Sequence, residues 1–168
     1  MNFRHPATLA EGEAGPLDEL RDGFLALLGE LFRGQVDFDL GDESILEELG
    51  EARDGRLAVG RRNYELVVVP RGMRNCFSVT RSLLAEFAAS GGAILCEGQQ
   101  VLTHVDGRPN PDRPAALAMA IRKHSFESAA DLVCEVRSRV PPYVTTADGG
   151  PLPGGIVFRR VAMEDGGK

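Results

Sequence analysis

Hydrophobic residues in the first third of the chain follow a helical and then a strand-like spacing. Over residues 17–31 leucine and phenylalanine recur every three or four positions, which predicts an amphipathic helix. Gly34 follows this segment and is expected to end the helix. Residues 36–40 alternate between hydrophobic and acidic side chains, which predicts a short strand. Asp42 is placed to cap a second helix that ends at Leu49.

The middle of the chain contains two runs typical of strands buried in a parallel sheet. Tyr64–Val69 is rich in valine, and residues 93–96 form a second hydrophobic run. Between them lies a helical pattern that Ser78 or Thr80 is expected to cap and that Gly91-Gly92 ends. A strand, a helix and a second strand in this order predict a right-handed βαβ unit.

The last part of the chain continues the alternation of strands and helices. Asp112 is expected to cap one helix, and Ser125 or Ser128 to begin another. Further strands are predicted over residues 143–146 and 156–161. This order predicts an α/β fold, a three-layer sandwich in which helices cover both faces of a mostly parallel sheet.

The end of the sequence suggests a domain boundary. We predict that residues 1–147 form one α/β domain, after which the chain is rich in glycine and proline. The strand predicted over residues 156–161 has no place in that domain. We therefore predict that residues 148–168 are a linker and the first strand of a following, absent domain, so that the chain is a piece of a larger protein.

Composition narrows the function classes. The chain has 168 residues, 43% hydrophobic and 26% charged, with a net charge of −6, which argues against a disordered chain. The acidic total, two tyrosines and no tryptophan argue against a nucleic-acid surface. No hydrophobic run reaches the roughly 20 residues of a membrane span, and acidic residues interrupt the first thirty positions, so neither a membrane segment nor a secretory signal is expected.

Few residues are spaced for metal or redox chemistry. Three scattered cysteines predict no disulfide framework, and three histidines lack the spacing of metal ligands. We therefore expect no metal and no cofactor, and a reducing, cytoplasmic location.

The strongest candidate for a catalytic side chain is Cys96, at the end of the second hydrophobic run. A nucleophile at a strand-to-helix turn needs small neighbours, so that backbone N–H groups can face an oxyanion. His104 and His124 are the histidines that could act as its base, and Glu127 follows His124. The alternative interpretation is that Cys96 is an inert core residue, because most cysteines that end hydrophobic strands are buried.

A second candidate site consists of the acidic residues Asp37, Asp39 and Asp42. Carboxylates near the carboxyl end of a strand point toward the crevice where α/β sheets bind ligands. These residues could therefore bind a cation, a sugar or another small ligand, or act as an acid/base pair. The alternative is an exposed strand end followed by a helix N-cap, and we favour this interpretation.

Two sets of motifs resemble known families. Cys96-Glu97-Gly98-Gln99-Gln100-Val101-Leu102 resembles the nucleophile turn of class I glutamine amidotransferases, although Ile94 stands where that turn normally has glycine. A longer pattern over about residues 3–160 resembles the amidotransferase-like, flavodoxin-like domain of bacterial glycoside hydrolases of the α-L-rhamnosidase type, which is related to the trimerisation domain of some β-galactosidases. Its matching segments are Val36-Asp37-Phe38-Asp39, Asp42-Glu43, Gly55-Arg56-Leu57, Gly60, Tyr64–Pro70, Ser78-Val79-Thr80, Leu83-Leu84, Phe87, Gly91-Gly92 and Thr103–Pro109.

The second resemblance implies a non-catalytic accessory module, because the amidotransferase nucleophile is generally not retained in that family. Its expected partners are other domains of the parent enzyme or copies of the same chain. Two alternatives remain: a cysteine-dependent amidohydrolase that uses Cys96, and a module that binds a sugar or another small ligand. An enzyme requires Cys96 at an exposed turn with a positive φ and an imidazole nearby, whereas the module requires a buried thiol.

Overall fold

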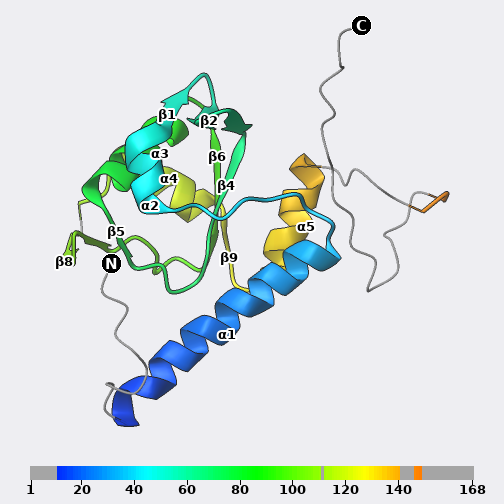
Figure 1. Ribbon diagram of the computed structural model, residues 1–168, viewed down its shortest axis with the longest axis horizontal. Coiled ribbons are helices and arrows are strands. Elements are labelled where there is room, and N and C mark those ends of the chain that lie inside the picture. Colours follow the sequence, from blue (N-terminus) through cyan, green and yellow to red (C-terminus); the bar gives the residue numbers. More distant parts are fainter. Residues whose placement is uncertain (1–10, 111, 141–145, 149–168) are drawn as a thin grey trace, which may run out of the picture.

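The computed structural model describes residues 11–110, 112–140 and 146–148 (Figure 1). Its helices are α1 (Glu11–Arg33), α2 (Glu43–Leu49), α3 (Ser78–Ala89), α4 (Ala115–Lys123) and α5 (Ala129–Arg139). Its strands are β1 (Gly50–Arg53), β2 (Arg56–Val59), β3 (Arg62–Tyr64), β4 (Leu66–Val69), β5 (Asn75–Cys76), β6 (Ala93–Glu97), β7 (His104–Val105), β8 (Arg108–Pro109) and β9 (Ser125–Phe126). This is a mixed α/β fold. The strand predicted over residues 156–161 lies outside the described residues.

A parallel sheet with the order β4-β6-β9 occupies the middle of the fold. Val68 lies opposite Leu95 in a parallel register, as expected for the two hydrophobic runs. Helix α3 connects β4 to β6, which confirms the predicted βαβ order. The glycine pair after α3 has two separate roles. Gly91 takes a φ of +100°, whereas a Cβ atom on Gly92 would lie 2.1 Å from the Phe87 ring.

Hydrophobic side chains form a core on each face of this sheet. Ile94 and Cys96 belong to one core, which α3 and α4 complete with Phe87, Leu117 and other side chains; we call it the α3–α4 core. Leu95, between them on β6, belongs to the other core, which contains Leu27 and Leu31 of α1 and Leu132, Val133 and Val136 of α5; we call it the α1–α5 core. Because neighbouring residues of a strand point to opposite faces, β6 contributes to both cores.

The remaining strands do not extend this sheet, contrary to the expectation of one mostly parallel sheet. Strands β1, β2 and β3 form an antiparallel sheet, and β5, β7 and β8 form a third small sheet. Two Asp-Gly turns explain most of this difference. Asp54-Gly55 joins β1 to β2 and Asp106-Gly107 joins β7 to β8, with positive φ at all four residues. Turns of this kind match the twist of a two-stranded hairpin.

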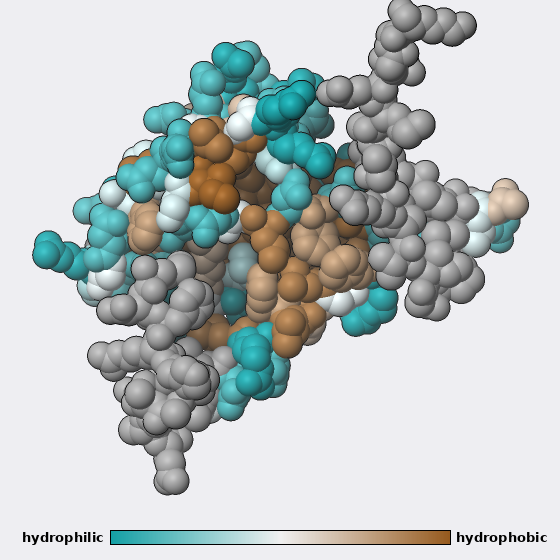
Figure 2. Space-filling view, in the orientation of Figure 1, coloured by the Kyte–Doolittle hydropathy of each residue, from teal (hydrophilic) through white to brown (hydrophobic). Residues whose placement is uncertain are grey.

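Residues 36–40 are not a strand, which corrects the prediction for this segment. They take part in no sheet, and their alternation persists only as far as Asp39: Val36 and Phe38 pack against the α1–α5 core, whereas Asp37, Asp39 and Leu40 are exposed. The Phe38 ring meets that of Phe32 edge-on, with centroids 5.2 Å apart. Figure 2 shows hydrophobic side chains gathered in the middle of this face, where the segment between α1 and α2 crosses. Side-chain packing, rather than backbone hydrogen bonds to a neighbouring strand, therefore keeps this segment against the core.

The ends of the helices differ from the predicted caps in three places. Helix α1 ends with Gln35, not Gly34, in the left-handed conformation, and Gly34 instead allows α5 to approach: a Cβ atom there would lie 2.8 Å from Val133. Neither Ser78 nor Thr80 caps α3, whose N-cap is Phe77, and Asp112 does not cap α4, whose N-cap is Pro114. The predicted caps Asp42 of α2 and Ser128 of α5 are confirmed.

Candidate functional site at the carboxyl edge of the parallel sheet

Cys96 is a fully buried residue of β6, with 0% of its surface exposed. Its side chain lies in the α3–α4 core, and burial raises the pKa of the thiol to about 12, although the Arg113 guanidinium acts in the opposite direction. Cys96 is not among the residues with positive φ, and the chain continues from β6 into a loop and β7, not into a helix. A thiolate at neutral pH and an oxyanion site at a sharp turn are therefore both missing at Cys96.

Neither candidate histidine makes a side-chain hydrogen bond with this thiol. His104 lies in β7, where its ring Nδ1 is 2.9 Å from Thr103 Oγ1 and its backbone carbonyl accepts a weak bond from the Sγ of Cys76. His124 follows α4, and its carbonyl accepts a 2.9 Å hydrogen bond from the Cys96 amide. His124 itself is the C-cap of α4 and lies just before β9. Burial and the nearby Arg139 lower its pKa, consistent with a position beside α5.

Two of the three candidate aspartates make hydrogen bonds that support the fold, and the third makes none with a described residue. Asp42 accepts hydrogen bonds from the amides of Ser44 and Ile45 and so caps α2. Asp39 accepts a 2.6 Å hydrogen bond from the Tyr64 hydroxyl, which ties the segment before α2 to β3. Asp37 is exposed and makes no hydrogen bond or ion pair with a described residue. The structure therefore does not bring these carboxylates together at the end of a strand, because residues 36–40 are not part of the sheet.

A different pair of residues occupies the carboxyl edge of the parallel sheet. Arg71 follows β4, and Glu97 is the last residue of β6. The Glu97 side chain is 7% exposed; it accepts a 3.3 Å hydrogen bond from the Arg71 amide and lies 3.6 Å from the Arg71 guanidinium. The same guanidinium also donates to the Glu127 carbonyl, just after β9. Arg71 thus joins the ends of all three parallel strands.

Open α/β sheets bind ligands at this edge. In this fold the charged side chains at the edge contact each other instead. Glu97 is the one acidic residue that is buried among the described residues, and its two contacts with Arg71 satisfy a charge that would be costly alone. Sequence reasoning missed this pair. The available signal was positional: Arg71 and Glu97 each stand at the end of a predicted parallel strand, so both belong to the same edge.

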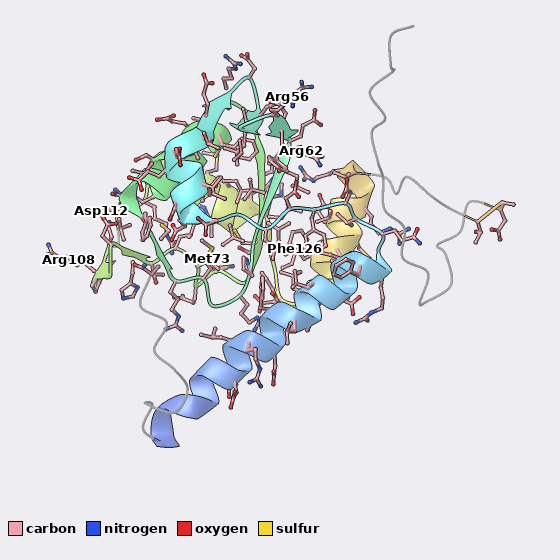
Figure 3. All side chains as sticks on the ribbon, in the orientation of Figure 1. Arg56, Arg62, Met73, Arg108, Asp112 and Phe126 are labelled. Carbon is pink, nitrogen blue, oxygen red and sulfur yellow. The ribbon has the colours of Figure 1, made fainter. Side chains whose placement is uncertain are left out.

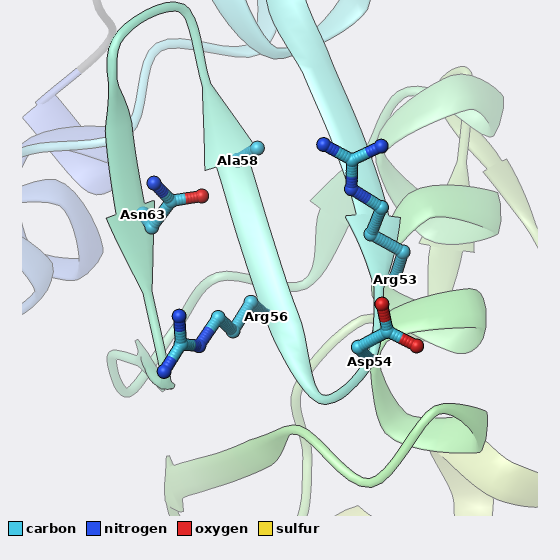
Figure 4. A pocket seen from close by; sticks show the side chains of 5 residues that line it. All are labelled: Arg53, Asp54, Arg56, Ala58 and Asn63. Carbon is cyan, nitrogen blue, oxygen red and sulfur yellow. The ribbon is translucent and has the colours of Figure 1, made fainter.

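Two open hollows lie elsewhere on the surface. One, of about 330 Å³, lies on the β1–β3 sheet and is lined by Arg53, Asp54, Arg56, Ala58 and Asn63 (Figure 4). Carboxylates already accompany its two cations: Glu51 is 3.5 Å from Arg53, and Glu65 is 3.0 Å from Arg56. Both arginines of this hollow are therefore paired within the chain, which leaves neither of them free to select an anionic ligand.

The second hollow, of about 580 Å³, lies beside the start of α3. It is lined by Ser78, Arg81, Val105, Asp106, Arg108, Pro109 and Asn110. Asp106 accepts a 3.1 Å hydrogen bond from the Ser78 amide, so a carboxylate of the chain itself already occupies the positive end of the helix. Arg108 projects away from the body at the tip of β8 (Figure 3). We assign no ligand to this hollow.

No group of histidine, cysteine or acidic side chains suited to hold a metal ion is present among the described residues. Within the same residues, no helix is long and hydrophobic enough to cross a membrane. Comparisons with protein-family models, with curated proteins and with solved structures found no match to this chain.

Proposed function

We propose that this chain is a non-catalytic accessory module of a carbohydrate-active glycoside hydrolase, with a flavodoxin-like fold of the class I glutamine amidotransferase type. In this role the module packs against other domains of the parent enzyme or against copies of itself, and the catalytic residues belong to another domain. The sequence resemblance suggests the family, and the parallel register of β4 and β6 is compatible with it.

The observation that carries the proposal is the burial of Cys96. It occupies the position of the amidotransferase nucleophile in the motif, yet its thiol lies in a hydrophobic core with a pKa of about 12. A buried, protonated thiol of this kind is what we expect in a family whose members no longer use this position as a nucleophile. The competing proposal of a cysteine-dependent amidohydrolase would require the core around Cys96 to open.

Hydrolysis of glutamine and of simple amides tests the non-catalytic part of the proposal. We expect the purified chain to release no more ammonia than the Cys96→Ala variant does. Hydrolysis by the unmodified chain that is lost in Cys96→Ala would contradict the proposal. Cys134→Ala is the matched control, because it removes an exposed thiol at a distance from the motif.

The DNA on either side of the coding segment tests the family part of the proposal. We expect the same reading frame to encode a barrel-forming glycosidase domain, with a β-sandwich after residue 168. Stop codons close to both ends, in DNA sequenced from the source genome, would contradict this part and leave the non-catalytic part standing.

A further inference from the structure

Helix α1 is packed into the core of the fold over only part of its length. Its C-terminal half carries Leu27 and Leu31, which are 2% and 5% exposed in the α1–α5 core. The helix extends beyond that core toward its N-terminus, and it runs past the end of the sheet at which β9 lies (Figure 1). Because β9 pairs with Cys96 and Glu97, the last residues of β6, this end is the carboxyl edge of the parallel sheet.

One hydrophobic contact joins the N-terminal half of α1 to this edge. Gly72, in the loop after β4, has a φ of +83°, and a Cβ atom there would overlap the Leu20 side chain. Leu20 therefore lies directly against the backbone of this loop. Of the side chains that the structure describes before Gly23, only that of Leu20 is hydrophobic, and it remains 42% exposed. The contact buries little hydrophobic surface, so it can be broken without disturbing the core.

A glycine lies between these two parts of α1. Gly23 follows Leu20 by one helical turn and precedes Leu27 by another. A Cβ atom at Gly23 would have no neighbour within 4 Å, so packing does not require a glycine at this position. Glycine in the interior of a helix weakens it, because the glycine backbone loses more conformational freedom on folding than that of any other residue. Gly23 therefore weakens α1 between its anchored half and the Leu20 contact.

We infer that α1 is a hinged strap over the carboxyl edge of the parallel sheet. The part from Leu27 to Arg33 stays anchored, and the part before Gly23 swings away from the loop after β4 when the Leu20 contact breaks. Hinges of this kind are a few residues that absorb a change in backbone angles. Open α/β sheets bind ligands at the carboxyl edge, so the strap controls access to the loop at Gly72.

Hydrogen exchange of the full chain, followed by mass spectrometry, tests the strap. Leu20→Ala removes the contact but keeps a residue that favours helix, so we expect exchange to become at least about threefold faster in residues 18–22 and in residues 71–74. Leu25→Ala is the matched control, because Leu25 lies on the same helix, is 54% exposed and should leave both segments unchanged. Faster exchange in α1 alone, with residues 71–74 unchanged, would overturn the inference.

Gly23→Ala tests the hinge and should have the opposite effect. It strengthens the helix at the hinge, so exchange in both segments should become about two- to fivefold slower. Gly29→Ala is the matched control within the anchored half, where the atom nearest to the new methyl group, at 3.1 Å, belongs to the flexible Arg33 side chain. Equal slowing of residues 71–74 by the two variants would overturn the hinge at Gly23. All rates are compared with those of the β6 amides, which report opening of the whole fold.

Gly72→Ala tests the same contact from the loop. The new methyl group would displace Leu20, so exchange in residues 18–22 should become faster in the parent chain. In the Leu20→Ala background the same change should add little, because the contact is already lost. An equal increase in both backgrounds would overturn the contact between Leu20 and Gly72. The inference goes beyond the proposed function and does not depend on it, and the glutamine hydrolysis result does not bear on it, so the two can fail separately.

Discussion

At the scale of single residues, burial decides which side chains are available for chemistry. Cys96 and Tyr64 show the same effect at different depths. Removal of the Cys96 thiol from water raises its pKa to about 12, and partial burial of Tyr64 beside Asp39 also raises the tyrosine pKa to about 12. In both cases the neutral form is favoured because the charged form would lose hydration.

Tyr64 provides a test of the contact that holds the segment before α2. Its folded pKa exceeds the ordinary value of 10, so the folded state retains the proton more strongly than the unfolded state. The corresponding stabilisation is complete below pH 10 and is lost as the pH rises through about 12. Ultraviolet titration of the Tyr143→Phe variant, in which only Tyr64 absorbs as a phenolate, should show this late transition.

Asp39→Asn should move the Tyr64 transition to lower pH, because the Asp39 carboxylate contributes to the raised pKa through its hydrogen bond and its charge. Asp37→Asn is the control and should have a smaller effect, since Asp37 acts only at a distance. Identical titration curves for Asp39→Asn and the parent would show that the Tyr64–Asp39 contact is absent in solution.

At the scale of elements, contacts between distant segments fix the ends of helices and strands. Helix α3 is the clearest case, because neither of its capping carboxylates belongs to it. Glu43 accepts a 2.7 Å hydrogen bond from the Phe77 amide, and Asp106 accepts one from the Ser78 amide. These bonds attach α2 and the β7–β8 turn to the start of α3. The helix therefore acts as the point where three parts of the chain meet.

Substitutions at Asp106 separate capping from backbone conformation. Asp106→Ala should lower the free energy of unfolding by about 1–2 kcal/mol, since it removes the cap and places alanine at a positive φ. Asparagine tolerates this backbone conformation and keeps a hydrogen-bond acceptor, so Asp106→Asn should lower the free energy of unfolding least. Asp106→Gly should lower it by an amount between those of the asparagine and alanine variants. Urea unfolding measures the three values, and a cost for asparagine equal to that for alanine would argue against the cap.

The Arg71–Glu97 pair should stabilise the carboxyl edge of the parallel sheet. Arg71→Ala leaves the buried Glu97 with the Arg71 amide as its only donor, and we expect a loss of about 1–2 kcal/mol of unfolding free energy. The double variant Arg71→Ala, Glu97→Gln should lose less unfolding free energy than the sum of the losses of the two single variants. The exposed pair Arg56–Glu65 is the control and should show a coupling near zero. Additive effects at Arg71 and Glu97 would show that the two side chains do not stabilise each other.

At the scale of the whole molecule, local patterns predict the helices and the central strands well. The β4–β6 pairing and the caps at Asp42 and Ser128 depend on hydrophobic runs and on side chains close in sequence, so they are visible in the sequence. The two Asp-Gly hairpins also have a local signal, the dipeptide itself, which favours a two-residue turn between antiparallel strands.

Other features depend on contacts that no local pattern encodes. The alternation over residues 36–40 correctly indicates that Val36 and Phe38 face the core, but it fails at Leu40, which is exposed, and it cannot show whether another strand is in reach to pair with this segment. The caps of α3 come from residues 28 and 34 positions away. The candidate nucleophile was found from its motif, whereas its depth in the core depends on helices α3 and α4.

Site-resolved alkylation of the three cysteines tests the central claim most directly. In iodoacetamide at neutral pH, followed by mass spectrometry, the exposed Cys134 should react first, and the buried Cys96 and Cys76 should react only as fast as the protein unfolds. All three should react readily in urea. Reaction of Cys96 in the folded protein as fast as that of Cys134, or faster, would contradict a buried thiol and a non-catalytic module.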